Sequence, residues 1–167
     1  MAGVWVALED IDENNGPLFY YPGSHNWPAL TNLEIGYQPS NDSAPFANRF
    51  IQAWEQYASY FKVEKKIFTP KAGQCLIWSS NLVHGGMPQK DLNRTRWSQV
   101  THYFFEGCAY HTPLFEAEFL GKYYFRDIKN LVTGETVSNK IFGHSINQQS
   151  KKLLDFSTFR TFFKFWN

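Results

Sequence analysis

The sequence predicts a mainly β fold with one amphipathic helix. Short apolar runs rich in β-branched and aromatic residues alternate with turn signals along most of the chain. The regular alternation of strands and helices that a parallel α/β sheet requires is not seen. A jelly-roll or a β-sandwich therefore fits the pattern best.

Two strand-like runs open the chain, at residues 4–8 and 18–21. The cluster between them, residues 12–16, is typical of a turn, and its Gly16 can adopt a positive φ. Pro22 and Gly23 end the second run. Later runs predict strands at residues 65–69, 75–79, 97–105, 123–128 and 137–141, the last two flanking a turn at Thr133 and Gly134.

One stretch has the spacing of an amphipathic helix that ends near residue 62. Its apolar positions are Phe46, Phe50, Trp54, Tyr57 and Phe61. Residues 41–43 can cap its start, with Pro45 in the first turn. We expect residues 1–110 to form a jelly-roll core. Residues 111–167 would add further strands and an aromatic-rich tail, residues 153–166, packed on the same domain.

Composition excludes several classes of partner. The chain has 167 residues and a net charge of +1, with its charges scattered, so neither a nucleic-acid nor a membrane surface is indicated. No apolar run approaches the ~20 residues of a membrane helix, and no signal peptide is recognisable. Cys75 and Cys108 do not make a disulfide framework, which favours a reduced, cytoplasmic setting.

His84 is the first candidate for chemistry. It follows the predicted strand at residues 75–79, and the two glycines after it leave space beside the ring. A neutral imidazole is a common ligand of first-row metals, including non-haem Fe(II) held by two histidines and one carboxylate. The alternative is a histidine satisfied at the mouth of its loop, and spacing alone favours that alternative.

Arg96 is the second candidate, at the start of a predicted strand, with Ser98 on the same side. Arginine can bind a carboxylate through two hydrogen bonds, and a serine hydroxyl can add another. The alternative is a surface ion pair, and Arg94 is a nearby competitor for the anion-binding role.

The other histidines carry weaker signals. His25 is expected to bond within its own turn, His102 to be a buried structural residue, and His111 and His144 to lie in loops. None of the five histidines has a carboxylate two residues downstream; those positions are Trp27, Gly86, Phe104, Pro113 and Ile146.

Four segments taken together resemble the phytanoyl-CoA dioxygenase family of Fe(II)/2-oxoglutarate oxygenases. They are residues 4–12 with Asn15 and Gly16; the turn at residues 21–25; residues 70–73 with Trp78, His84 and Gly85; and residues 96–98 with residues 101–103. The resemblance covers roughly residues 3–110 in the family's order, with weaker similarity through residues 128–140.

The resemblance implies a double-stranded β-helix, a cupin-like jelly-roll, that hydroxylates a small molecule with Fe(II) and 2-oxoglutarate. In the family, a His-x-Asp pair and a distal histidine hold the iron, and His84 matches the distal histidine. Arg96 matches the residue that holds the distal carboxylate of 2-oxoglutarate, with Ser98 beside it, and Trp5 matches an aromatic wall of that pocket. The family's arginine lies six residues before a strand histidine, here His102, which favours Arg96 over Arg94.

This sequence departs from the family at the His-x-Asp pair, which precedes the strand that here begins at Val4. We therefore expect an N-terminally truncated member that lacks its first core strand or strands, binds neither iron nor 2-oxoglutarate stably, and is inactive alone. No catalytic residue is assigned. An exposed sheet edge would favour a homo-oligomer. The alternative function is a non-catalytic jelly-roll that binds a small molecule or a sugar.

Overall fold

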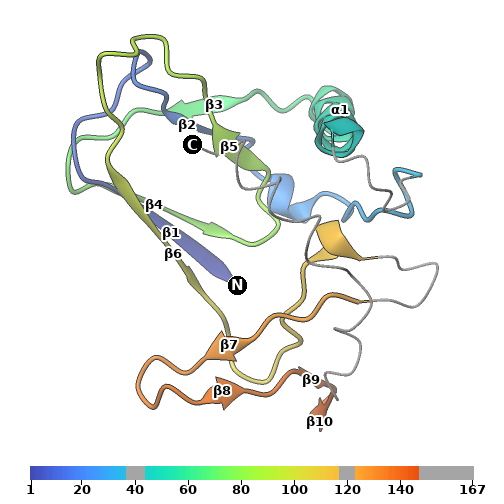
Figure 1. Cartoon of the computed structure of the whole chain (residues 1–167). Coiled ribbons are helices and arrows are strands. Elements are labelled where there is room, and N and C mark those ends of the chain that lie inside the picture. Colours follow the sequence, from blue (N-terminus) through green and yellow to red (C-terminus); the bar gives the residue numbers. More distant parts are fainter. Residues whose placement is uncertain (37–43, 117–122, 147–167) are drawn as a thin grey trace. The chain divides into compact units, whose positions relative to one another are not determined.

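The computed structural model describes residues 1–36, 44–116 and 123–146 (Figure 1). The chain forms two compact units. The first comprises residues 1–29 and 53–104, and the second comprises residues 30–52 and 105–167.

The first unit contains a three-stranded antiparallel sheet in the order β4-β1-β6. Its strands are β1 (Ala2–Ala7), β4 (Cys75–Ser79) and β6 (Ser98–Tyr103) (Figure 1). Along β1 the buried positions alternate with partly exposed ones, because successive side chains of a strand point to opposite faces. Gly3, Trp5 and Ala7 form the buried face. The strand predictions at residues 4–8, 75–79 and 97–105 are confirmed to within a few residues.

A second antiparallel sheet in the same unit has the order β3-β2-β5. It consists of β2 (Leu18–Tyr20), β3 (Lys66–Phe68) and β5 (His84–Gly86). The sequence did not predict β5, because a three-residue strand that is two-thirds glycine has almost no strand propensity of its own. It exists because Phe19 and Tyr20 of β2 provide a partner for it.

The two sheets share one hydrophobic core. It contains Trp5, Ala7, Ile11, Leu18 and Trp78, with Phe68, Leu76 and Leu82 packed against it. The rings of Trp5 and Phe68 meet edge to face, with centroids 6.2 Å apart. The Trp78 indole lies directly over Gly3, where an added Cβ would come within 2.4 Å of the ring. Burial of each large apolar side chain stabilises the fold by about 1.5–3 kcal/mol.

The predicted helix is α1 (Ala44–Phe61), and its proposed cap at residues 41–43 lies outside the described residues. Within the first unit, Phe61 stacks on Trp27 at 5.6 Å between centroids, and Tyr57 meets Trp27 edge to face at 6.1 Å. Trp27 directly follows a short 3-10 helix, η1 (Ser24–Asn26). The α-helix ends where Lys62 adopts a positive φ of 54°, which breaks the helical backbone.

The second unit contains short hairpins and a second 3-10 helix, η2 (Pro113–Phe115). Its strands form two pairs, β7 (Ile128–Lys129) with β8 (Thr136–Val137), and β9 (Lys140–Ile141) with β10 (His144–Ser145). The predicted strand at residues 123–128 was wrong in extent, since Phe125 makes one bridge, to His111, and β7 begins at Ile128.

The predicted continuous strand at residues 137–141 was also wrong, because β8 ends at Val137 and β9 begins at Lys140, with the buried Asn139 between them. This side chain accepts from the Tyr110 amide at 2.6 Å and donates to the Arg126 carbonyl at 3.2 Å. The prediction for residues 153–166 falls outside the described residues.

The described residues therefore form a β-rich fold with one α-helix, as predicted. Both cysteines are free thiols. None of the helices in the described part of the chain is long and apolar enough to cross a membrane.

Candidate functional site

His84 is the exposed first residue of β5. Its Nδ1 lies 2.7 Å from the Leu82 carbonyl oxygen. A carbonyl oxygen can only accept a hydrogen bond, so Nδ1 carries a proton, and in the neutral ring Nε2 is then the nitrogen with the free lone pair. The Trp78 ring packs on the imidazole, with centroids 4.5 Å apart. His84 is therefore oriented, with Nε2 in the form that can ligate a metal.

The turn at residues 21–25 holds the chain beside His84. The Val83 amide donates to the buried Ser24 hydroxyl at 2.8 Å, and the Tyr21 amide donates to the Val83 carbonyl at 3.0 Å. His25 itself is exposed on this turn. Sequence reasoning missed Ser24, because its partner lies 59 residues away.

Arg96 extends its guanidinium to the sheet that contains β5. Nη1 donates to the Gly16 carbonyl at 2.6 Å and lies 3.1 Å from where a Cβ on Gly86 would be. Gly86 and His84 are alternate residues of one strand, so they face the same side, about 6.6 Å apart. The structure thus brings Arg96 and His84 to the same face of β5.

Arg94, the competing arginine, has a carboxylate partner. Its Nη1 lies 2.6 Å from Asp12 Oδ2. The hydrogen bond from Arg94, with a second from the Asn14 amide, lowers the pKa of Asp12, and the same contact with Asp12 raises the pKa of Arg94. Among the described residues, no carboxylate pairs with Arg96. Of the two arginines, Arg96 is therefore the one without a carboxylate partner among the described residues.

Ser98 and Trp5 lie on the same face of their sheet. Ser98 pairs with Ala7, and Trp5 pairs with Val100, so alternation along both strands brings Ser98 and Trp5 to one side. Ser98 is partly exposed, whereas Trp5 is only 5% exposed to solvent and belongs to the core.

No group of three or more metal-ligating side chains gathers anywhere in the described residues. His102 faces Gly3 across the β1–β6 pair, with its ring 6.4 Å from that of Trp78. It is exposed, so the prediction of a buried structural histidine was wrong. The described residues thus do not assemble around His84 the two histidines and one carboxylate that a non-haem iron site of this kind uses.

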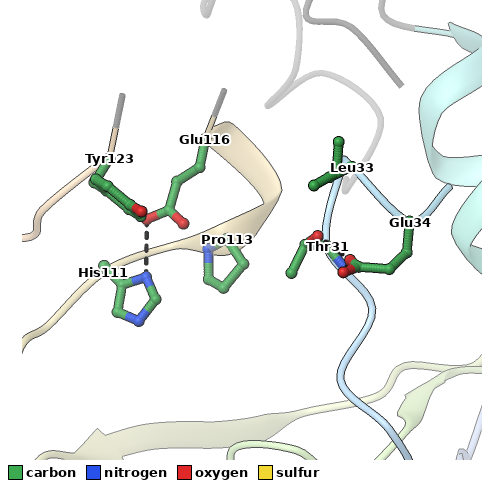
Figure 2. Close-up of a pocket in the computed structure, with 7 residues that line it drawn as sticks. All are labelled: Thr31, Leu33, Glu34, His111, Pro113, Glu116 and Tyr123. Atoms are coloured by element: carbon green, nitrogen blue, oxygen red, sulfur yellow. Dashed lines mark hydrogen bonds and ion pairs between the residues drawn. The ribbon is translucent and has the colours of Figure 1, made fainter. Parts of the chain in front are cut away.

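The second unit contains a separate, open pocket with a volume of about 340 Å³ (Figure 2). Figure 2 shows His111, Glu116 and Tyr123 on one side and the loop bearing Thr31, Leu33 and Glu34 on the other, with Pro113 also in the lining. His111 Nδ1 lies 2.8 Å from Glu116 Oε1, and Glu116 is only 2% exposed. A hydrogen bond from the Thr31 hydroxyl lowers the pKa of Glu34. His111 had no sequence signal, because nothing in the spacing indicates that Glu116 would be buried.

The described residues thus form a β-rich protein with an oriented histidine on one strand face and, beside it, an arginine that no described carboxylate pairs with. Residues 1–94 match the family model described as Phytanoyl-CoA dioxygenase. The chain belongs to the phytanoyl-CoA dioxygenase family, and the family suggests an oxygenase-type function that depends on iron and 2-oxoglutarate. No curated protein sequence matches the chain. The matched range includes Trp5 and His84 and ends two residues before Arg96.

Proposed function

We propose that the protein is an Fe(II)/2-oxoglutarate oxygenase by type, which hydroxylates a small molecule in the cytoplasm on a jelly-roll fold. We also propose that, contrary to the expectation from the sequence, this chain binds 2-oxoglutarate through Arg96 without iron. The observation that carries the proposal is the position of Arg96. Its guanidinium lies on the face of β5 that also bears His84, and among the described residues no carboxylate neutralises it.

In this proposal Arg96 binds the distal carboxylate of 2-oxoglutarate. A planar guanidinium can grip a carboxylate through two parallel N–H groups, and Ser98 can add a hydroxyl donor. Trp5 contributes an apolar wall from the core. His84 would present Nε2 toward the keto-acid end of the same molecule.

The described residues do not fit an iron site by themselves, because no group of three or more metal-ligating side chains gathers around His84. For this chain we expect little or no turnover of 2-oxoglutarate, because the sequence contains no His-x-Asp pair.

The test is calorimetric titration of the full chain with 2-oxoglutarate in the absence of metal. Arg96→Ala should weaken binding by roughly 10-fold or more, as expected for losing a charged hydrogen-bond partner. The matched control is Arg94→Ala, which removes the neighbouring arginine and should leave the affinity within about twofold of the wild type. Equal affinity in the wild type and Arg96→Ala would refute the proposed role of Arg96.

The same preparations are then supplied with Fe(II), ascorbate and 2-oxoglutarate under air. We expect no succinate above the protein-free background. Succinate formation that depends on the protein would show that an iron site does assemble.

A further inference from the structure

The chain on both sides of Arg96 is held by one side chain, Glu9. Glu9 Oε2 accepts from the Thr95 hydroxyl at 2.8 Å, and Oε1 accepts from the Trp97 amide at 2.6 Å. The two residues that flank Arg96 are therefore bound to one carboxylate. Glu9 is half-buried and lies two residues after the end of β1, the central strand of its sheet.

Asn15 holds the same segment from a second direction. Its Nδ2 donates to the Thr95 carbonyl at 2.9 Å, across 80 residues of sequence. The Asn15 side chain is itself fixed, because its Oδ1 accepts from the Asp12 amide at 2.8 Å and its surface is only 1% exposed. A buried amide whose groups are all engaged cannot rotate without losing hydrogen bonds.

Gly16, the residue after Asn15, binds the guanidinium group of Arg96. The Gly16 carbonyl accepts from Nη1 at 2.6 Å, and Gly16 has a φ of +79°, a backbone conformation that side chains disfavour. A Cβ on Gly16 would also lie 3.4 Å from Nη1. The loop after β1 thus holds both the backbone at Arg96 and the guanidinium.

We propose that Glu9 and Asn15 are positioning residues for Arg96, which they hold in place before a dicarboxylate such as 2-oxoglutarate binds. This inference rests on the proposed function and names the residues that prepare its anion site. A side chain fixed beforehand loses less conformational freedom when the ligand binds, so affinity rises without any new contact to the ligand. Neither Glu9 nor Asn15 needs to touch the ligand.

The test uses two near-isosteric variants of the full chain, Glu9→Gln and Asn15→Asp. The first replaces one of the two acceptor oxygens with a donor, and the second replaces the Nδ2 donor with an acceptor. The matched control is Arg94→Met. It breaks the ion pair to Asp12, a separate link between the same two segments, and leaves the contacts of Arg96 unchanged.

Two readouts are needed. The first is the arginine side-chain ¹⁵N spectrum, in which the Arg96 signal is assigned by its loss in Arg96→Lys. A guanidinium that is held in place gives separate Nη signals, and we expect these to average in Glu9→Gln and Asn15→Asp but not in Arg94→Met.

The second readout is the Kd for 2-oxoglutarate without metal. It should rise by roughly tenfold in the two variants and by less than twofold in the control.

The outcomes separate the inference from the proposed function. Unchanged Arg96 signals in both variants would overturn the positioning role, whether or not 2-oxoglutarate binds. Averaged signals in the variants, with wild type and Arg96→Ala equally unable to bind 2-oxoglutarate, would support the positioning role and refute the proposed function. If Asn15→Asp fails to fold, Glu9→Gln decides the question alone, since Glu9 is only half-buried.

Discussion

Arg94 and Arg96 lie two residues apart and have different partners. Arg94 forms an ion pair with Asp12, whereas Arg96 bonds to the Gly16 carbonyl. Composition alone left both arginines open as anion-binding candidates, and the family resemblance favoured Arg96 by its spacing from His102. The difference arises from the loop at residues 12–16, which presents a carboxylate to one arginine and a carbonyl to the other.

The Asp12–Arg94 pair should make stability depend on pH in acid. The pKa of Asp12 is lowered on folding, so its stabilisation is present above the ordinary aspartate pKa and is lost as the pH falls through the lower, folded value. Asp12→Asn should lower Tm at pH 7, and the difference from wild type should shrink below about pH 4. Thermal melts from pH 7 to pH 2 measure this difference.

The matched double variant combines Asp12→Asn with Arg94→Gln. Because the two side chains act as a pair, the double variant should lose less Tm at pH 7 than the sum of the two single variants. Losses that simply add would show that the ion pair contributes nothing of its own, as exposed pairs sometimes do.

At the scale of elements, β5 is decisive for the site and is a strand that the sequence did not reveal. Its conformation depends on pairing with β2 and on the turn that contains Ser24. By contrast, β1 and β4 were predictable because they carry apolar or aromatic residues of high strand propensity.

Ser24→Ala should destabilise β5 locally. The Val83 amide would lose its hydroxyl acceptor, and an unsatisfied, partly buried donor costs about 1–3 kcal/mol. Hydrogen exchange should show faster exchange at Val83 and along β5, with β1 and β4 unchanged. His25→Ala, at an exposed position of the same turn, is the control; equal exchange in both variants would contradict the role given to Ser24.

At the scale of the whole molecule, the sheet β4-β1-β6 has two edge strands. Within the described residues, β4 and β6 each pair with β1 and with no other strand. Unpaired strand edges favour pairing with another chain. We therefore propose that the protein self-associates through an edge of this sheet.

Light scattering after size exclusion, over a wide range of protein concentration, tests the self-association. We expect a dimer or larger species, and Gln99→Lys on β6 should shift the equilibrium toward monomer, because charged side chains on an edge strand oppose pairing. The control is Leu131→Lys, which places the same charge at an exposed position of the second unit. A monodisperse monomer at every concentration would rule the proposal out.

The sequence by itself determined the β-rich class, the family, the helix and the identity of His84 and Arg96 as candidates. These follow from local information, namely propensity, the spacing of apolar residues and short motifs. The tertiary structure alone decided which residues meet. In the folded chain β5 pairs with β2, and Asp12 forms an ion pair with Arg94. Glu9 and Asn15 form hydrogen bonds to the residues that flank Arg96. These contacts join residues about 60 to 90 apart, and no local pattern encodes them, because each exists only after the sheets have packed.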